Sequence, residues 1–399
     1  MRKEKKEKIA IVGASIGGCA TALILQQAHY NVSIYEQRFS NAMVDRGEGI
    51  MLPNALLATL IEQGLVDSHF PAKLIKERVH LSYDAKNDKE RIITTHPHFA
   101  VATHWASLYN SLHNCLPDKI YYNSKVTGVS KDKQVTLTFN HHEEYDFDIV
   151  IFADGYFSLG RKFLFPAVRP EFAKYIAWRG TLSRIDAETL AQLAEKVLYY
   201  GYDKGHLLIY AIPDVNAENP QKDLLVNWVL YETIDSKHPL THDYRAQDNI
   251  TAEAMSKNYI DYLHDMAKKH FPPFARNIVF ETEKPYIQAI YDAYIPEYFV
   301  ENIGVIGDAS IVSRPHVGAG AVKALQDALA MQRYVYDTDD LPLALQHWSK
   351  IQQHSGNNLL NLGRSLGELL VTKTPEWDKL DQATMDDLWE TAVFSPPTA

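Results

Sequence analysis

Apolar and polar positions change their spacing twice within the first forty residues. Residues 8–14, KIAIVGA, form a short run of small and β-branched side chains that is typical of a buried strand. Residues 19–29 then carry alanine and leucine at helical spacing, and the next apolar run, VSIYEQR, indicates a second strand. The turn GASIGG separates the first strand from the helix. This order of strand, glycine-rich turn, helix and strand predicts the start of a parallel βαβ unit.

The spacing changes again in the middle of the chain. Aromatic runs with period two, YIAWRGTL, KVLYYGYD, HLLIYAIPD and LLVNWVLYE, lie between residues 171 and 290. Such runs, separated by Gly, Pro, Asn and Asp, predict a mixed or antiparallel sheet. The strand and helix pattern of the first forty residues then returns, with NIGVIGDAS as a buried strand and a helix at 318–334. Further elements are expected as helices at 52–64, 104–116, 251–270 and 341–370, strands within 119–140 and a buried strand at 148–153.

Together these elements predict an α/β fold. Its core is a Rossmann-like nucleotide-binding domain, into which a mixed or antiparallel sheet domain is inserted, and a helical region follows at the C-terminus. We expect the nucleotide-binding domain over residues 1–170 and 291–340, the inserted sheet over 171–290 and the helical region over 341–399.

Composition narrows the class of protein. The 399 residues are 46% hydrophobic and 23% charged, which is ordinary for a globular chain and excludes disorder as the main state. The formal net charge is −10. The first eight residues carry five basic and two acidic groups, a charge of +3, so the rest of the chain carries −13 and is a poor surface for nucleic acid or anionic lipid. Two cysteines form no disulfide framework, and the 17 histidines show no metal-ligand spacing. We expect a cytoplasmic protein with no metal site and no membrane partner.

The glycine turn and a nearby acid predict an adenosine-containing dinucleotide as ligand. Gly13 and Gly18 hold the first and third positions of a dinucleotide fingerprint, and Ser15 holds the second. Glycine permits the tight bend and the close approach of backbone to a pyrophosphate, which the N–H groups at the helix start then bind. Glu36 ends the next strand, where a carboxylate accepts hydrogen bonds from ribose hydroxyls.

Two later segments determine which dinucleotide is expected. ADGYFSLGRK (153–162) follows one buried strand, and GDAS with RPHVGAGAVKALQDA (307–328) follows another. With the glycine turn, in this order, they resemble the single-component FAD-dependent aromatic hydroxylases, the flavin monooxygenases of the p-hydroxybenzoate hydroxylase type. The resemblance covers nearly the whole chain. It implies FAD as cofactor, NADH or NADPH as co-substrate, and O₂.

Each motif has a physical role in that interpretation. Asp308 ends a strand where ligands of open α/β sheets bind, so its carboxylate is expected to hold a ribityl hydroxyl. The helix that begins at Gly318 directs its positive end at the flavin. Read locally, Asp154 and Gly155 form only a turn, and the resemblance places them near the FAD pyrophosphate. Arg46 either binds a FAD phosphate or ribose or is solvated. The residues expected to contact FAD are Gly13, Ser15, Ile16, Gly17, Gly18, Glu36, Gln37, Arg38, Arg46, Leu52, Trp105, Val126, Asp154, Gly155, Asp308, Pro315, Gly318, Ala319 and Gly320.

One helix start departs from the broader family. Many of these hydroxylases place an arginine there against the flavin, whereas this chain has VATHWASLYNSL, with His104 and no arginine. Together with YIAWRG, NWVLYE and RPHVGAG, the run around Trp105 looks like the branch around 2,6-dihydroxypyridine 3-hydroxylase. That branch acts on hydroxylated N-heteroaromatic rings. Glu48, like His104, differs from the small residues usual in the family.

Substrate residues are expected where the second sheet faces the flavin ring. His316 either orients or deprotonates a phenolic oxygen, or it caps a backbone group. Arg179 lies in an apolar strand and needs a ligand or a carboxylate as its partner. For each aromatic candidate, packing in the sheet core is the competing interpretation. The candidates are Arg179, His316 and Tyr210 for catalysis, and Tyr202, Trp228, Tyr231 and Pro315 for substrate contact.

The resemblance also implies a mechanism. NADH or NADPH reduces the flavin, the reduced flavin captures O₂ as a C4a-hydroperoxide, and one oxygen atom passes to an electron-rich aromatic or heteroaromatic ring. Only one dinucleotide turn is found, which favours transient binding of the nicotinamide cofactor. A monomer or homodimer is expected. The alternatives are a flavin oxidase of an amine or related small molecule and a non-catalytic FAD-fold binding protein; the absence of a WxWxIP segment argues against a halogenase.

Overall fold

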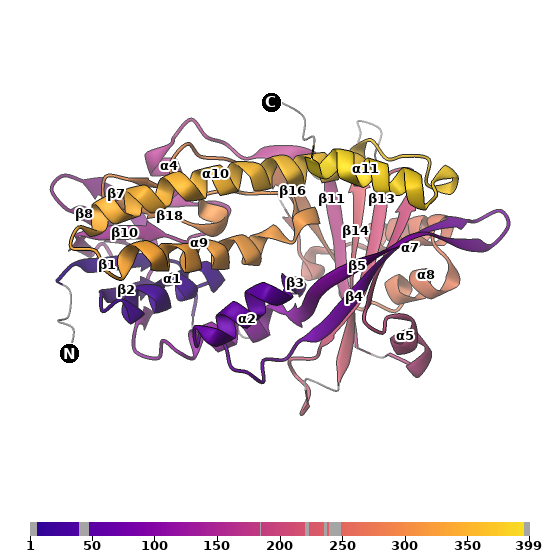
Figure 1. The fold of residues 1–399 in the computed structure, drawn as a ribbon, viewed down its shortest axis with the longest axis horizontal. Helices are drawn as coiled ribbons and strands as arrows, with labels where there is room; N and C mark the ends of the chain where they lie inside the picture. The colour runs from indigo at the N-terminus through magenta and orange to yellow at the C-terminus, as the bar shows by residue number, and fades with distance from the viewer. Residues whose placement is uncertain are drawn as a thin grey trace.

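The computed structural model describes residues 6–39, 48–183, 185–219, 223–234, 238 and 249–394. Two sheets lie side by side along the long axis of the molecule (Figure 1). Helices α1, α2 and α9 lie with the smaller sheet, whereas α7 and α8 lie beyond the larger sheet on the opposite side from α11 (Figure 1). The predicted α/β fold, with a Rossmann-like domain, a second sheet domain and C-terminal helices, is confirmed.

The smaller sheet brings the three sequence motifs to one edge. Its strand order is β17-β18-β10-β1-β2-β6, and every neighbouring pair except β17 with β18 is parallel. The glycine turn follows β1, the Asp-Gly pair follows β10 and the Gly-Asp pair follows β18. Because these strands are parallel neighbours, their carboxyl ends meet, which is where open α/β sheets bind ligands. The strands are β1 (Lys8–Val12), β2 (Asn31–Tyr35), β6 (Ile120–Tyr121), β10 (Ile149–Phe152), β17 (Phe299–Val300) and β18 (Ile303–Val305).

The larger sheet has nine strands in the order β15-β16-β11-β14-β13-β12-β4-β5-β3. Its four central aromatic strands are the runs that the period-two pattern predicted. The structure adds a long hairpin, β4 and β5, and a short edge strand, β3, all from residues before 105 that the prediction placed in the first domain. The strands are β3 (Gly49–Pro53), β4 (Lys73–Asp84), β5 (Lys89–His104), β11 (Glu171–Leu182), β12 (Lys196–Tyr202), β13 (Gly205–Pro213), β14 (Leu224–Thr233), β15 (Asn249–Ile250) and β16 (Tyr286–Asp292); β7 (Val126–Lys131), β8 (Val135–Phe139) and β9 (Glu144–Phe147) form a separate three-stranded sheet.

The two faces of the nine-stranded sheet have different neighbours. One face, with Trp178 and Trp228, packs against α7 and α8. The other face, with Tyr175 and Tyr210, packs against Met51, Val317 and the C-terminal helices. Val317 comes from the loop before α9, so this second face is the one turned toward the motif segments. We call it the inner face.

The helices cover these sheets and join them. Helix α10 begins over the smaller sheet and reaches the larger one, where α11 continues (Figure 1). Among the residues that the structure describes, no helix is both long and apolar enough to span a bilayer. The helices are α1 (Ile16–Gln27), α2 (Asn54–Glu62), α3 (Trp105–His113), α4 (Leu159–Leu164), α5 (Ala187–Gln192), α7 (Lys257–His270), α8 (Pro273–Phe280), α9 (Ala319–Val335), α10 (Leu341–Gly367) and α11 (Gln382–Phe394), with a π-helical turn at Glu368–Thr372 and 3₁₀ turns at Ala252–Ala254, Gly307–Ala309, Pro315–Val317 and Trp377–Lys379.

Candidate active site

The glycine turn after β1 is closed by contacts that only glycine allows. Gly13 has φ +103°, and its N–H donates to the Tyr35 carbonyl at 2.8 Å. A Cβ on Gly18 would lie 1.9 Å from the Gly13 carbonyl oxygen, so α1 starts directly against the turn. The Ser15 side chain makes no capping hydrogen bond to α1. The backbone N–H groups of the first turn are therefore available to a phosphate.

Glu36 is held by the backbone in a way that suits a ribose. Its side chain is buried, and its two carboxylate oxygens accept hydrogen bonds from the N–H groups of Ala14 and Arg38, each at 2.9 Å. One bond ties Glu36 to the glycine turn and the other to the segment after β2. Each oxygen keeps a further lone pair, so both remain able to accept a ribose hydroxyl.

A single guanidinium joins the Asp-Gly and Gly-Asp motifs. Arg161 is 3% exposed and donates to the carbonyls of Asp308 at 2.8 Å, Ala309 at 3.1 Å and Tyr156. Burial lowers the pKa of Arg161, and the charge of Asp154 opposes that shift. Nothing in the sequence indicated a role for Arg161 beyond its place in the motif. The structure shows that it fixes the two strand ends relative to each other.

Asp154 points one oxygen at protein and leaves the other unpaired. Oδ2 accepts from the Leu159 N–H at 2.6 Å, whereas Oδ1 is buried without a partner in the part of the chain that the structure describes. Burial raises the pKa of this carboxyl. A Cβ at Gly155 would meet no atom within 4 Å, so open space adjoins the pair. An unpaired oxygen beside open space fits a ligand hydroxyl or N–H group.

Asp308, the start of α9 and strand β3 converge. A Cβ on Gly320 would lie 4.0 Å from Asp308 Oδ1, and one on Gly318 would lie 3.7 Å from the Met51 carbonyl oxygen. The side chain of Asp308 is exposed to solvent, yet the surrounding protein raises the pKa of its carboxyl, and Arg161 lowers it. Leu52 follows Met51 in β3. The segments predicted to contact the ribityl chain and the flavin ring therefore lie together.

The remaining predicted FAD contacts fall into four groups. Trp105 begins α3, donates its backbone N–H to the Glu48 carbonyl at 2.9 Å and stacks its ring on Tyr109. Val126 is a buried residue of β7 whose surroundings show no feature specific to a flavin. Arg46 lies outside the described residues. The other predicted contacts are close in the sequence to the residues discussed above; they are Ile16, Gly17, Gln37, Pro315 and Ala319.

A polar cluster lies on the inner face of the larger sheet. Arg179 donates to Glu48 Oε2 at 2.8 Å, and Asn227 Oδ1 accepts from the Gly49 N–H at 2.8 Å. A Cβ on Gly49 would lie 2.8 Å from the Tyr210 hydroxyl and 2.7 Å from the Asn227 side chain. Burial is the largest single effect and lowers the pKa of Arg179, but the charge of Glu48 and then those of neighbouring tyrosines together raise the pKa overall. We name Glu48, Arg179, Tyr210 and Asn227 the inner-face cluster. No pattern in the sequence indicated Asn227, and Glu48 stood out only as a departure from the small residues usual in the family that the chain resembles.

His316 lies on the same face, in the loop before α9. Its Nε2 is 2.8 Å from the Tyr175 hydroxyl, and its ring centroid is 4.6 Å from that of Tyr231. Burial, followed by the charges of His206 and Arg314, lowers the pKa of His316 well below its usual range. The imidazole is therefore neutral at pH 7. Pro315 begins the same 3₁₀ turn.

Two predicted substrate residues are not part of this site. Tyr202 and Trp228 lie on the opposite face of the sheet and pack in the core beneath α7 and α8. The Tyr202 hydroxyl donates to the Tyr231 carbonyl at 3.0 Å, and the Trp228 indole N–H donates to Thr282 Oγ1 at 2.8 Å. Both polar groups are thus satisfied by protein. The competing interpretation, core packing, is correct for these two side chains.

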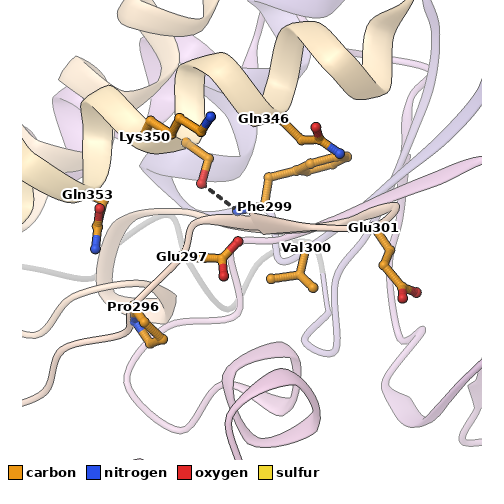
Figure 2. A pocket seen from close by; sticks show the side chains of 9 residues that line it. Pro296, Glu297, Phe299, Val300, Glu301, Gln346, Lys350 and Gln353 are labelled. Atoms are coloured by element: carbon orange, nitrogen blue, oxygen red, sulfur yellow. Dashed lines mark hydrogen bonds between the residues drawn. The ribbon is translucent and has the colours of Figure 1, made fainter.

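A separate surface hollow of about 650 Å³ opens between α10 and the segment 296–301 (Figure 2). Helix α10 is joined to this segment by a hydrogen bond from the Phe299 N–H to Ser349 Oγ at 3.0 Å. None of the predicted cofactor or substrate residues lines this hollow. The candidate active site lies instead where the segments that carry the three motifs meet the inner face of the larger sheet.

Comparison with known proteins agrees with this geometry. A family model described as FAD binding domain-like matches residues 172–292. The chain is 29% identical to 2,6-dihydroxypyridine 3-monooxygenase of Paenarthrobacter nicotinovorans over 91% of each chain, and 23% identical to 6-hydroxynicotinate 3-monooxygenase of Bordetella bronchiseptica over 93% of this chain and 94% of that one.

Solved structures give the same picture. The structure of 2,6-dihydroxypyridine-3-hydroxylase from Arthrobacter nicotinovorans superposes with a TM-score of 0.82 at 25% identity, covering 94% of this chain and 95% of that one. Klebsiella pneumoniae HpxO, complexed with FAD and uric acid, has a TM-score of 0.76 at 18% identity, covering 96% and 93%. The second likeness shows the fold alone.

Fold, motifs and relatives together define the chain as an FAD-dependent monooxygenase of the aromatic hydroxylase class. An enzyme of this class uses FAD, NADH or NADPH, and O₂. Within the class, the chain is similar to the 2,6-dihydroxypyridine 3-hydroxylase branch, as the motifs around Trp105 and Arg179 predicted.

Proposed function

We propose that this enzyme hydroxylates an electron-rich ring that carries hydroxyl or oxo oxygens, of the N-heteroaromatic or phenolic class, bound against the inner-face cluster. The 2,6-dihydroxypyridine and 6-hydroxynicotinate relatives support this class of ring. The roles of individual residues in the site are likewise our proposal.

One observation carries the choice of ring. Arg179 Nε and Asn227 Nδ2 are buried donors without a partner in the described chain. A buried N–H group left unpaired costs about 1–3 kcal/mol, so a ligand that supplies acceptors is favoured there. Oxygen atoms on a planar ring supply such acceptors. An apolar ring or a protonated amine does not.

The residues fit FAD, and each has a defined task. Glu36 would hold the adenosine ribose, the first turn of α1 the pyrophosphate, and Asp308 the ribityl chain. When bound, FAD would supply the redox chemistry, with NADH or NADPH as the reductant and O₂ as the source of the oxygen atom added to the ring, the other oxygen atom leaving as water. The positive end of α9 would stabilise negative charge on the reduced ring system.

The inner-face cluster would orient the substrate ring. Arg179, tied to Glu48, presents positive charge that favours a deprotonated ring oxygen, and such an oxygen makes the ring a better nucleophile. Within the cluster, burial raises the pKa of the Tyr210 hydroxyl, so it stays protonated and can donate a hydrogen bond to the substrate. Tyr231 and Pro315 would close the sides of the ring.

The test is NADH and NADPH oxidation by the yellow holoenzyme against a panel of hydroxypyridines, hydroxynicotinates and phenols. One ring should stimulate oxidation and be recovered with one added oxygen atom. Tyr210→Phe should raise KM for that ring several-fold, whereas Tyr202→Phe, the matched loss of a buried hydroxyl on the other face, should leave KM unchanged. Flavin reduction by an amine without NADH or NADPH would contradict the proposal.

We further propose a cytoplasmic enzyme that is a monomer or homodimer. The exposed free thiol of Cys115 supports a reducing compartment. Light scattering of the purified holoenzyme measures the oligomeric state, and a tetramer or larger assembly would contradict it.

A further inference from the structure

His316 belongs to a short chain of polar side chains that starts at an ion pair. Arg314 binds Asp292 through two nitrogens, Nε at 3.2 Å and Nη2 at 3.0 Å. Arg314 and Tyr175 meet beside Gly367. A Cβ on Gly367 would lie 2.8 Å from Arg314 Nη1 and 2.9 Å from the Tyr175 hydroxyl, so both groups lie close to the same place. The Tyr175 hydroxyl in turn lies 2.8 Å from His316 Nε2. The order is Asp292, Arg314, Tyr175, His316.

The chemistry of these groups sets the direction of the last hydrogen bond. Burial raises the pKa of Tyr175 well above its usual value, and Arg314 opposes the shift, so the phenol keeps its proton. A guanidinium has only donors, so Arg314 interacts with the lone pairs of the Tyr175 oxygen. Among the described residues, His316 Nε2 is the one acceptor within hydrogen-bond distance of the Tyr175 hydroxyl, so it accepts the Tyr175 proton. A neutral imidazole that accepts at Nε2 carries its proton at Nδ1.

The second nitrogen of the ring is free for a ligand. His316 Nδ1 is buried and has no hydrogen-bond partner among the described residues. The rings of His206 and Tyr231 lie beside it, with centroids 5.5 and 4.6 Å away. His206 places its own Nδ1 3.2 Å from the Leu370 carbonyl, which can only accept, so His206 is also a neutral Nδ1–H imidazole. The Nδ1–H group of His316, buried on the inner face, therefore has no acceptor among the described residues.

We propose that Tyr175 is a positioning residue that fixes His316 as the Nδ1–H tautomer, so that His316 donates a hydrogen bond from Nδ1 to an oxygen of the ring substrate. This inference rests on the proposed function for the identity of the acceptor, but the tautomer does not depend on it. His316 is then a neutral donor that stabilises a deprotonated ring oxygen. It is not the base that removes the proton.

The first test reads the tautomer directly in the holoenzyme. In protein with ¹⁵N-labelled histidine, a two-bond proton–nitrogen spectrum shows which ring nitrogen lacks hydrogen. If that nitrogen is Nε2, it couples to both of the carbon-bound ring protons. If it is Nδ1, it couples to one of them. The His316 signals are those lost in His316→Asn. We expect the unprotonated nitrogen to be Nε2 in the wild type and a mixture of tautomers in Tyr175→Phe. An unprotonated Nδ1 in the wild type would overturn the proposal whether or not any ring is hydroxylated.

The second test compares two replacements of His316. The Asn amide nitrogen mimics Nδ1–H, and the Gln amide nitrogen mimics Nε2–H. Asn should therefore retain at least about tenfold more kcat/KM than Gln, the loss of one good hydrogen bond. Tyr175→Phe should lower kcat/KM and alter its pH profile, while Tyr202→Phe, the control, should change neither. Equal or greater activity in the Gln variant would overturn the proposal.

Discussion

Replacing Glu36 by Gln tests the proposed ribose site with almost no change in shape. Both carboxylate oxygens accept backbone N–H groups, from Ala14 and from Arg38, each at 2.9 Å. A Gln side chain has one accepting oxygen and one donating NH₂ group. Either orientation of the amide therefore places a donor against a backbone N–H that the protein has buried.

The size of the effect follows from that conflict. A hydrogen bond to a charged group contributes about 1.5–3 kcal/mol, and an unpaired buried N–H costs about 1–3 kcal/mol. The FAD-free protein should lose about 2–3 kcal/mol of stability at this turn, a drop of roughly 2–5 °C in Tm for a chain of this length. FAD affinity should also fall, about tenfold to a hundredfold, because the ribose hydroxyls lose a charged acceptor.

The assay is thermal unfolding of the FAD-free protein, followed by FAD titration monitored by flavin fluorescence. Asp148→Asn is the matched control: Asp148 Oδ2 accepts the Lys8 N–H at the other end of β1, at 2.7 Å, but at an exposed position. There the amide can keep its oxygen toward Lys8, and its NH₂ group then faces the exposed side chain of Gln134, whose own amide can turn to accept the hydrogen bond that it now donates to Asp148 Oδ1 at 2.9 Å, so little should change. If the Glu36 variant matched the control in both Tm and FAD affinity, the assignment of Glu36 to the ribose would be wrong.

Three further predictions concern the same region. Gly18→Ala should abolish flavin in the purified protein, because its Cβ would lie 1.9 Å from the Gly13 carbonyl; retained yellow colour would refute the close approach. Asp308→Ala should strongly weaken FAD retention without lowering the Tm of the FAD-free protein, since its side chain is exposed; unchanged flavin content would refute its role. Burial lowers the pKa of His206 to about 4, against 6.5 in the unfolded chain. The neutral imidazole therefore contributes about 3 kcal/mol to the free energy of unfolding above pH 6.5, and this contribution is lost as the pH falls toward 4. His206→Asn keeps the donor to Leu370 but does not titrate, and a stability-against-pH curve that is not flattened by it would refute that linkage.

The features that the sequence predicted are those carried by neighbouring residues. The turn from Gly13 to Gly18 and the acid at Glu36 lie within one βαβ unit, so strand, helix and acceptor can be placed from their spacing alone. The likeness of the later motifs to the aromatic hydroxylases then indicated the cofactor, which the comparisons confirmed.

The errors arose where the register of strands decides which way a side chain points. Trp228 and Tyr231 are three positions apart in one strand, so alternation puts them on opposite faces, and they could not both face a ligand. That constraint was available from the sequence and was not applied. The partnership of Arg179 with Glu48 spans 131 residues and depends on how β3 joins the sheet edge, which no local pattern contains.

The binding of two strand ends by Arg161 has a consequence for how the molecule is made. The Asp-Gly motif leaves the ribosome about 150 residues before the Gly-Asp motif, and the whole run of aromatic strands is synthesised between them. β10 must therefore wait for its parallel neighbour β18, and the buried guanidinium has no carbonyls of Asp308 and Ala309 to bind until then. The nascent chain cannot complete a flavin cradle before the segment at 307–320 emerges. Cofactor uptake is thus a late event in biogenesis, and a chain truncated ahead of that segment would be left with an open half-site.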